Sequence, residues 1–225
     1  LTAWLQRPGV IAAVVSINCL QNNFGDEGLS TLLSAIKGTS VRSLCGLTEG
    51  QTIADFSGQN LGPFDCKIMA AESAFSGFIA ALAHLAICQN KIGSEGGTAL
   101  VEAIKTSNLE SISIGKDLTL PIKGELDSPT LDASDQDIDP GYVIILAWWL
   151  TTPFTAALNS LRCGSNPITD KGMIPLLDAV KGIGLTELDI SKTKVGPPTA
   201  AKLAEVLADG TPFSAAVNSL TVDST

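Results

Sequence analysis

One internal duplication constrains the fold of this chain more than any other feature. Residues 152–161 read Thr-Pro-Phe-Thr-Ala-Ala-Leu-Asn-Ser-Leu, and residues 211–220 read Thr-Pro-Phe-Ser-Ala-Ala-Val-Asn-Ser-Leu. Eight of the ten aligned positions are identical, and the two segments lie 59 positions apart. A match of this quality indicates a repeated structural unit, and the distance corresponds to two units of about 29 residues each.

A spaced apolar pattern defines the unit, and residues 158–168 are its clearest copy. Apolar residues occupy positions one, four, six and eleven, and position nine is Asn166. We name each unit by its first residue number. Strong units begin at 14, 82, 158 and 185, and weaker ones at 41, 51, 109, 128 and 217. A polar side chain at position nine can satisfy backbone groups of the turn. These polar residues are Asn22, Gln59, Asn90, Asp117, Gln136, Asn166 and Thr193.

A helix signal follows the strong units. After Gly28, Leu29, Leu32, Leu33 and Ile36 fall at i, i+3, i+4 and i+7, which places one apolar stripe on a helix. Each unit therefore predicts a short strand, a turn, a helix and a return loop. The strand period of two directs positions four and six into a core, and positions three, five and seven outward. Stacked units would pair their strands in parallel and carry the helices on the other side.

Composition excludes several classes of function. The chain has 225 residues and a net charge of −9, so it lacks the basic face that nucleic acids or anionic membranes require. Its longest apolar run, 143–150, is far shorter than the roughly 20 residues of a membrane helix. The five cysteines form no Cys-x-x-Cys pair, and the chain has no Asn-x-Ser/Thr sequon. We expect an intracellular protein, in the cytoplasm or an organelle.

The pattern Leu-x-x-Leu-x-Leu-x-x-Asn-x-Leu, followed by a turn such as 25–28 (Gly-Asp-Glu-Gly) and a helix, resembles the leucine-rich repeat of the ribonuclease-inhibitor type. NOD-like receptors and RanGAP-like proteins share this repeat. The resemblance covers nearly the whole chain, and segments 44–52 and 56–63 are similar to stretches of large repeat proteins of unicellular algae. It implies an α/β solenoid shaped as a horseshoe, with parallel β-strands on the concave face and α-helices on the convex face.

The domain expected from this resemblance is irregular. The intervals between first positions range from 10 to 32 residues, so repeat lengths vary, and loops near 45–52 and 119–129 should bulge. We expect one leucine-rich-repeat domain over residues 1–225, with about eight to nine units. We also expect this domain to be a fragment or to lack the polar caps that such arrays need.

Partner-binding candidates lie at two places. One is the expected strand face, which is polar and slightly acidic, so it either binds a basic partner or is simply solvated. The other is the helix expected after Pro140, where residues 143–150 are apolar on all sides. The side of this helix that does not face the core must also be covered. Either a partner covers it, or a neighbouring helix or the 119–129 loop does. The candidates on the strand face are Gln89, Lys116, Asp132, Asp135, Arg162, Asp189 and Lys192, and those on the helix are Ile144 and Trp148.

Three further features have simpler explanations. The run Asp135-x-Asp137-x-Asp139 begins like a calcium loop, but its glycine comes one place late and position twelve is Leu146. The unit register explains these aspartates as strand, turn and helix-cap residues. His84, the only histidine, is expected on the surface. Cys88 falls at position seven and is expected to be exposed, so it is the cysteine to test for reactivity.

The sequence therefore predicts a non-catalytic protein–protein interaction or scaffold module, without cofactor or metal, that belongs to a larger chain or assembly. Two alternatives stay open. Family analogy alone allows an inhibitor or regulator of another enzyme. An enzyme on a repeat scaffold would need a phosphate loop, a metal set or a nucleophile triad, and none is visible in the sequence.

Overall fold

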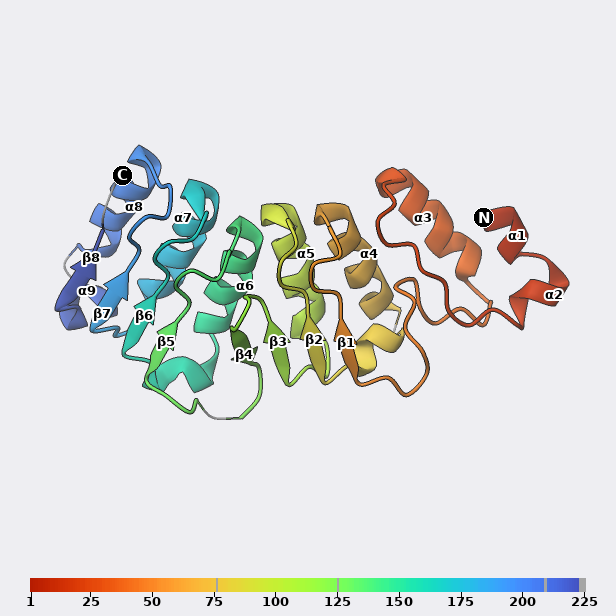
Figure 1. The fold of residues 1–225 in the computed structure, drawn as a ribbon, viewed down its shortest axis with the longest axis horizontal. Coiled ribbons are helices and arrows are strands. Elements are labelled where there is room, and N and C mark those ends of the chain that lie inside the picture. Colours follow the sequence, from red (N-terminus) through yellow and green to blue (C-terminus); the bar gives the residue numbers. More distant parts are fainter. Residues whose placement is uncertain (76, 125, 209, 223–225) are drawn as a thin grey trace.

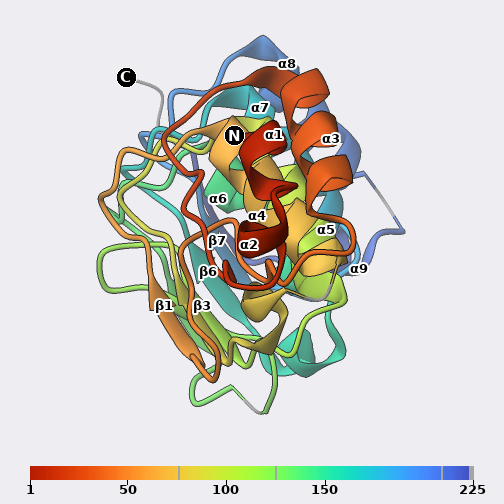
Figure 2. The same ribbon diagram turned by 90° about the vertical axis from the view of Figure 1, so that its right-hand side faces the viewer.

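A computed structural model describes residues 1–75, 77–124, 126–208 and 210–222. The fold is mixed α/β, with a layer of short strands on one side and a layer of helices on the other (Figures 1 and 2). The strands are β1 (Ile53–Asp55), β2 (His84–Ala86), β3 (Ser111–Ser113), β4 (Thr119–Pro121), β5 (Thr130–Asp132), β6 (Ser160–Arg162), β7 (Glu187–Asp189) and β8 (Ser219–Thr221).

The helices follow one another along the molecule, and the two ends of the chain lie at its opposite ends (Figure 1). Helix α4 packs on α5, α5 on α6, α6 on α7, and α7 on α8. The helices are α1 (Thr2–Leu5), α2 (Pro8–Ile11), α3 (Gly25–Ile36), α4 (Pro63–Ala74), α5 (Gly93–Lys105), α6 (Pro140–Leu150), α7 (Thr169–Val180), α8 (Pro197–Val206) and α9 (Pro212–Ala216), with 3-10 helices η1 (Phe78–Ala81) and η2 (Pro153–Ala157).

Strand pairing confirms the register predicted from the apolar pattern. Two four-stranded sheets have the orders β1-β2-β3-β4 and β5-β6-β7-β8. In the first sheet Ala54, Leu85 and Ile112 stand side by side, and each is a position-four residue. The second sheet aligns position four in the same way, through Leu131, Leu161, Leu188 and Leu220. In each sheet, alignment of equivalent residues places an apolar row against the helices.

Strand β4 departs from the expected all-parallel arrangement. Where a bulging loop was expected, residues 119–121 pair antiparallel with β3. The amides of Ile114 and Gly115 donate to the carbonyl of Leu118, which closes a tight turn between the two strands. The first positions of units 109 and 128 are only 19 residues apart, which leaves no room for a helix after this hairpin. Unit 109 therefore has no helix, and the first sheet ends at β4.

Unit 41 also lacks a helix, and a buried carboxylate holds it in place. Glu72 of α4 accepts hydrogen bonds at Oε2 from the Ser43 hydroxyl and from the amides of Leu44 and Cys45. Its Oε1 accepts from the amide of Ile79. A fully buried glutamate is tolerated because these donors replace the water it loses.

The polar residue at position nine acts as predicted in units 82 and 158. Asn90 donates from Nδ2 to the carbonyls of Phe56, Ile87 and Cys88, and its Oδ1 accepts from the amide of Leu61. Because Phe56 and Leu61 belong to unit 51, this one buried side chain joins two neighbouring units.

Position seven was predicted to point outward, and this was wrong. Leu20 and Cys88 occupy this position, and both are buried. The strands end at position five, so the alternation of strand side chains does not reach position seven. The chain turns there, and position-seven residues of adjacent units meet: Cys88 Sγ donates to Ser57 Oγ at 3.1 Å.

Candidate functional site

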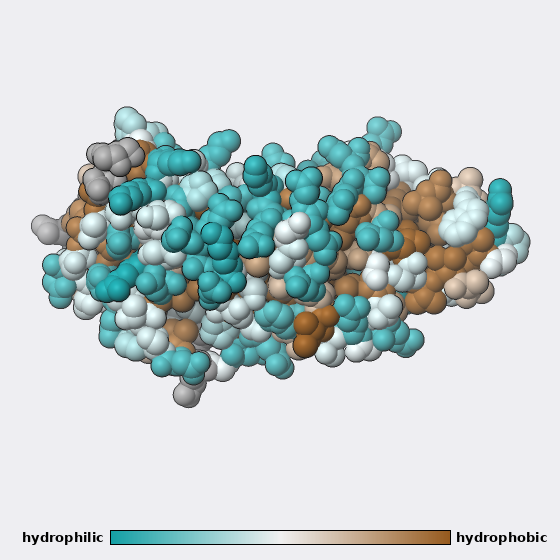
Figure 3. All heavy atoms as spheres, viewed as in Figure 1, coloured by the Kyte–Doolittle hydropathy of each residue, from teal (hydrophilic) through white to brown (hydrophobic). Residues whose placement is uncertain are grey.

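The open face of the strands carries the side chains of positions three and five. We call it the strand face; in the second sheet its rows are Thr130, Ser160, Glu187 and Ser219, and Asp132, Arg162, Asp189 and Thr221. The half of the molecule that holds β5 to β8 is mostly hydrophilic in Figure 3, whereas hydrophobic residues gather at the N-terminal end. The strand face is therefore a polar surface over an apolar core.

Arg162 is held at the centre of this face by Glu187 of the next strand. Its Nε and Nη2 donate to Oε1 of Glu187 at 3.1 and 3.0 Å, and Nη2 also reaches Oε2 at 3.2 Å. The Ser160 hydroxyl donates to Oε2 of the same carboxylate at 2.8 Å. Hydrogen bonds from Ser160 and then Arg162 lower the pKa of Glu187. The guanidinium is thus oriented and largely neutralised by its own chain.

Aspartates stand on both sides of Arg162 in the same row. Asp132 lies opposite it on β5 and Asp189 on β7. Each of these aspartates accepts the amide of the residue two places later at Oδ1, as Asp55 does in the first sheet. One carboxylate oxygen therefore closes the turn after the strand. Asp132 is exposed and Asp189 is half-exposed, so both carboxylates can also meet a cationic group from outside.

The predicted residues Gln89, Asp135 and Lys192 lie at the rim of the strand face. All three occupy position eight, are exposed, and adopt a left-handed backbone with φ of 59°, 56° and 53°. This conformation lets the chain leave the strand toward the helix layer. Lys116 is also exposed but sits in the β3–β4 turn, with no left-handed backbone. The rim is therefore a mixture of charges.

Ile144 and Trp148 lie elsewhere, on α6, which packs between α5 and α7. Both are half-buried against the core, while Ile145, Leu146 and Trp149 are fully buried, as predicted from the register. The Trp149 indole also donates to the carbonyl of Pro121 on β4. Neighbouring helices and the β3–β4 hairpin cover most of this apolar helix, so it does not join the strand face in one site.

His84 stands half-buried on the strand face of the first sheet, among hydroxyl groups. Its Nδ1 lies 2.8 Å from Ser111 Oγ and its Nε2 lies 3.3 Å from Ser113 Oγ. Asp55, which a catalytic triad would need as the partner of the histidine, instead directs Oδ1 to the amide of Ser57. Both ring nitrogens meet hydroxyls, so this cluster orders the face and does not form a triad.

The acidic run 132–139 is dispersed by the fold. Asp139 caps α6 by accepting the amides of Gly141 and Tyr142, and it also accepts the amide of Gly93. Asp135 and Asp137 have left-handed backbones in the turn. In the described part of the chain, no group of three or more His, Cys, Asp or Glu side chains could hold a metal ion.

The cysteine side chains lie inside the fold. All five are free and buried, including Cys88, which was predicted to be exposed. Burial raises the pKa of the Cys163 thiol to about 12. A thiol in that state is a poor nucleophile at neutral pH. Cysteine chemistry is therefore not a property of the strand face.

Sequence reasoning missed two parts of this surface. The clamp of Ser160 and Glu187 on Arg162 needs the strand register, which brings residues 25 or more positions apart into contact. Ile53 on β1 is 63% exposed and forms an apolar spot beside His84. Asp223, also expected on this face, lies outside the described residues.

No family model matches the sequence, and a search of curated proteins found no match. None of the helices in the described ranges is both long and apolar enough to cross a membrane.

Proposed function

We propose that the chain is a leucine-rich-repeat solenoid of the ribonuclease-inhibitor type, with the strand face on the inside of the curve. Two observations support this proposal: position-four residues of successive units stand side by side, and Asn90 and Asn166 bridge neighbouring units. Helices are wider than strands, so a row of strand–helix units curves toward its strands.

The function that this geometry supports best is a non-catalytic interaction or scaffold module within a larger intracellular assembly. The observation that carries the proposal is the charge of the strand face around Arg162. Glu187 already pairs with the guanidinium, so Asp132 and Asp189 are in excess. A protein segment rich in lysine or arginine complements this surface.

The charges of these aspartates favour specificity and fast association over high affinity. Exposed ion pairs each contribute about 0.2–1 kcal/mol. Complementary charge instead steers encounter and rejects partners of the wrong sign. The partner's affinity should therefore fall as salt rises, because exposed charges are screened.

Affinity capture with charge-reversed variants tests this function. The strand-face variant carries Asp132→Lys and Asp189→Lys, and the control carries Glu27→Lys and Glu102→Lys on helices α3 and α5, with the same change in charge. We expect proteins with basic segments to be retained by the wild type and the control and lost by the strand-face variant. Equal retention by all three chains would reject the strand face as the binding surface.

A further inference from the structure

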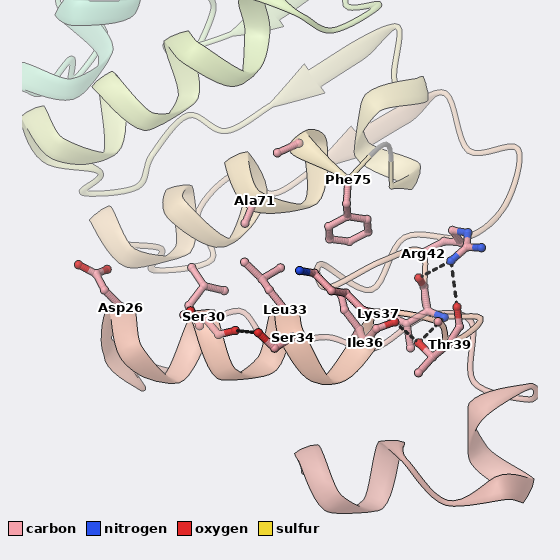
Figure 4. A pocket seen from close by; sticks show the side chains of 14 residues that line it. Asp26, Ser30, Leu33, Ser34, Ile36, Lys37, Thr39, Arg42, Ala71 and Phe75 are labelled. Carbon is pink, nitrogen blue, oxygen red and sulfur yellow. Dashed lines mark hydrogen bonds between the residues drawn. The ribbon is translucent and has the colours of Figure 1, made fainter.

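A groove runs between helices α3 and α4, away from the strand face. It encloses about 810 Å³. Figure 4 shows Leu33 and Ile36 of α3 on one wall, with Ala71 and Phe75 across from them. Its lining is mainly apolar, although it opens to solvent on the helix side of the molecule.

Comparison with a second pair of helices explains why the groove exists. Units 41 and 109 both lack a helix, so α3 and α4, like α5 and α6, flank a missing helix. Helices α5 and α6 close this gap because Gly97 meets Gly141: a Cβ on Gly97 would lie 2.2 Å from the Gly141 carbonyl oxygen. Their backbones are therefore in contact.

Large side chains occupy the corresponding places in α3 and α4. The fifth residue of α3 is Leu29 where α5 has Gly97, and the second residue of α4 is Phe64 where α6 has Gly141. The Phe64 ring also packs edge-to-face on Phe24, with ring centroids 5.2 Å apart. These side chains hold the two helices apart at one end and leave the space beyond them open.

Two cations without carboxylate partners in the described residues line the groove near the C-terminal end of α3, and their charged groups lie apart in Figure 4. Figure 4 shows the Lys37 amino group extending back over the groove, between Leu33 and Phe75. The guanidinium of Arg42 is fixed by donating from Nη1 to the carbonyls of Thr39 and Val41. In the ranges that the structure describes, neither cation forms an ion pair, whereas Lys67 near the far end is paired with Asp26.

The volume of the groove and its lining define the kind of ligand that fits. The volume lies inside the roughly 300–1,000 Å³ of small-molecule sites. A ligand must place an apolar body along the walls and a negative charge at Lys37, whose amino group lies over the groove.

We propose that this groove binds a long-chain fatty carboxylate, with the acyl chain between α3 and α4 and the carboxylate on Lys37. Apolar burial supplies the affinity, and the Lys37 amino group fixes the direction of the ligand. This site is separate from the strand face, so either proposal can fail without the other.

Isothermal titration calorimetry with sodium dodecanoate, kept below its micelle concentration, tests the site. We expect saturable binding of one molecule to the wild type, at least about tenfold weaker binding to Lys37→Gln, and none to Ala71→Trp, whose ring fills the groove. Ala200→Trp on α8 is the matched control and should bind as the wild type does. Circular dichroism confirms that each variant is folded.

Three results would overturn the proposal. The first is the absence of saturable binding to the wild type. The second is equal binding by Ala71→Trp and Ala200→Trp, which would place the ligand elsewhere. The third is equal affinity for dodecanoate and dodecyltrimethylammonium, since a site with a lysine amino group must prefer the anion. If Ala71→Trp fails to fold, Lys37→Gln decides the question alone.

Discussion

The side-chain amide of Asn166 donates a 2.7 Å hydrogen bond to the carbonyl of Ala133, which belongs to the preceding unit. The Oδ1 of Asn166 accepts from the amides of Gln136 and Ile138 in that same unit. The side chain is 2% exposed, so no solvent can replace these bonds. A buried amide of this kind joins two units through backbone groups that would otherwise be unsatisfied.

Replacement of Asn166 by alanine should therefore destabilise the fold. We expect the free energy of unfolding, measured by urea denaturation, to fall by about 2–3 kcal/mol, because several buried backbone groups lose their partner. The control is Asn22→Ala, the same position in unit 14, where the side chain is exposed and bonds only to Cys19 and Leu20. The free energy of unfolding of Asn22→Ala should fall by less than about 1 kcal/mol. Equal losses in the two variants would contradict this role for position nine.

Glu187 should titrate below the ordinary range of glutamate. Its folded-state pKa is lowered by Ser160 and Arg162, so the charged carboxylate stabilises the fold above the unfolded-state pKa. That contribution is lost as the pH falls through the lowered pKa. Carboxyl ¹³C NMR should show the midpoint moving upward in Ser160→Ala and in Arg162→Gln. Ser219 faces Glu187 from β8, on the other side of β7, and Ser219→Ala should leave the midpoint unchanged. A midpoint that is also unchanged in Ser160→Ala and Arg162→Gln would show that these two residues do not stabilise the Glu187 carboxylate.

Gly97→Ala should reduce stability although alanine is the better helix former. The new Cβ would meet the Gly141 carbonyl at 2.2 Å, so α5 and α6 must move apart. Such overpacking costs about 1–3 kcal/mol. Gly9 on α2 has no atom near its added Cβ, so Gly9→Ala should be neutral or gain up to about 1 kcal/mol. Thermal unfolding compares the two variants, and an unchanged melting temperature for Gly97→Ala would rule out the direct contact.

Much of the strand–helix layout could be predicted from the sequence because core positions repeat with the unit. Leu161 and Leu188 are inward at position four, and the structure pairs them in that register. Asn166 could be identified because a buried turn needs one side chain that both donates and accepts. These features depend on local spacing, which one sequence displays directly.

Other features depend on how distant segments meet, and spacing does not display them. The antiparallel strand β4 follows from a short interval that has room for a hairpin and no helix. Cys88 is buried because the strand ends before position seven. The α3–α4 groove depends on the size of Leu29 and Phe64 relative to Gly97 and Gly141, across units far apart in the chain.

The position of the strand-face aspartates could be predicted from the sequence, but their hydrogen bonds could not. Asp132 and Asp189 were correctly placed on the strand face by their position in the unit. Their second role, accepting an amide two residues later, follows from turn geometry that periodicity alone does not specify. Arg162 was correctly placed on this face too, but its neutralisation by Glu187 became visible only in the folded chain.

We have proposed that a basic protein segment binds the strand face around Asp132 and Asp189. The deciding measurement is the dissociation constant of a captured partner for the wild type, for Asp132→Lys/Asp189→Lys and for Glu27→Lys/Glu102→Lys. We expect binding about tenfold weaker or more for the strand-face variant alone, with the difference shrinking as salt screens the charges. Equal weakening by the two variants, or no weakening by either, would contradict it.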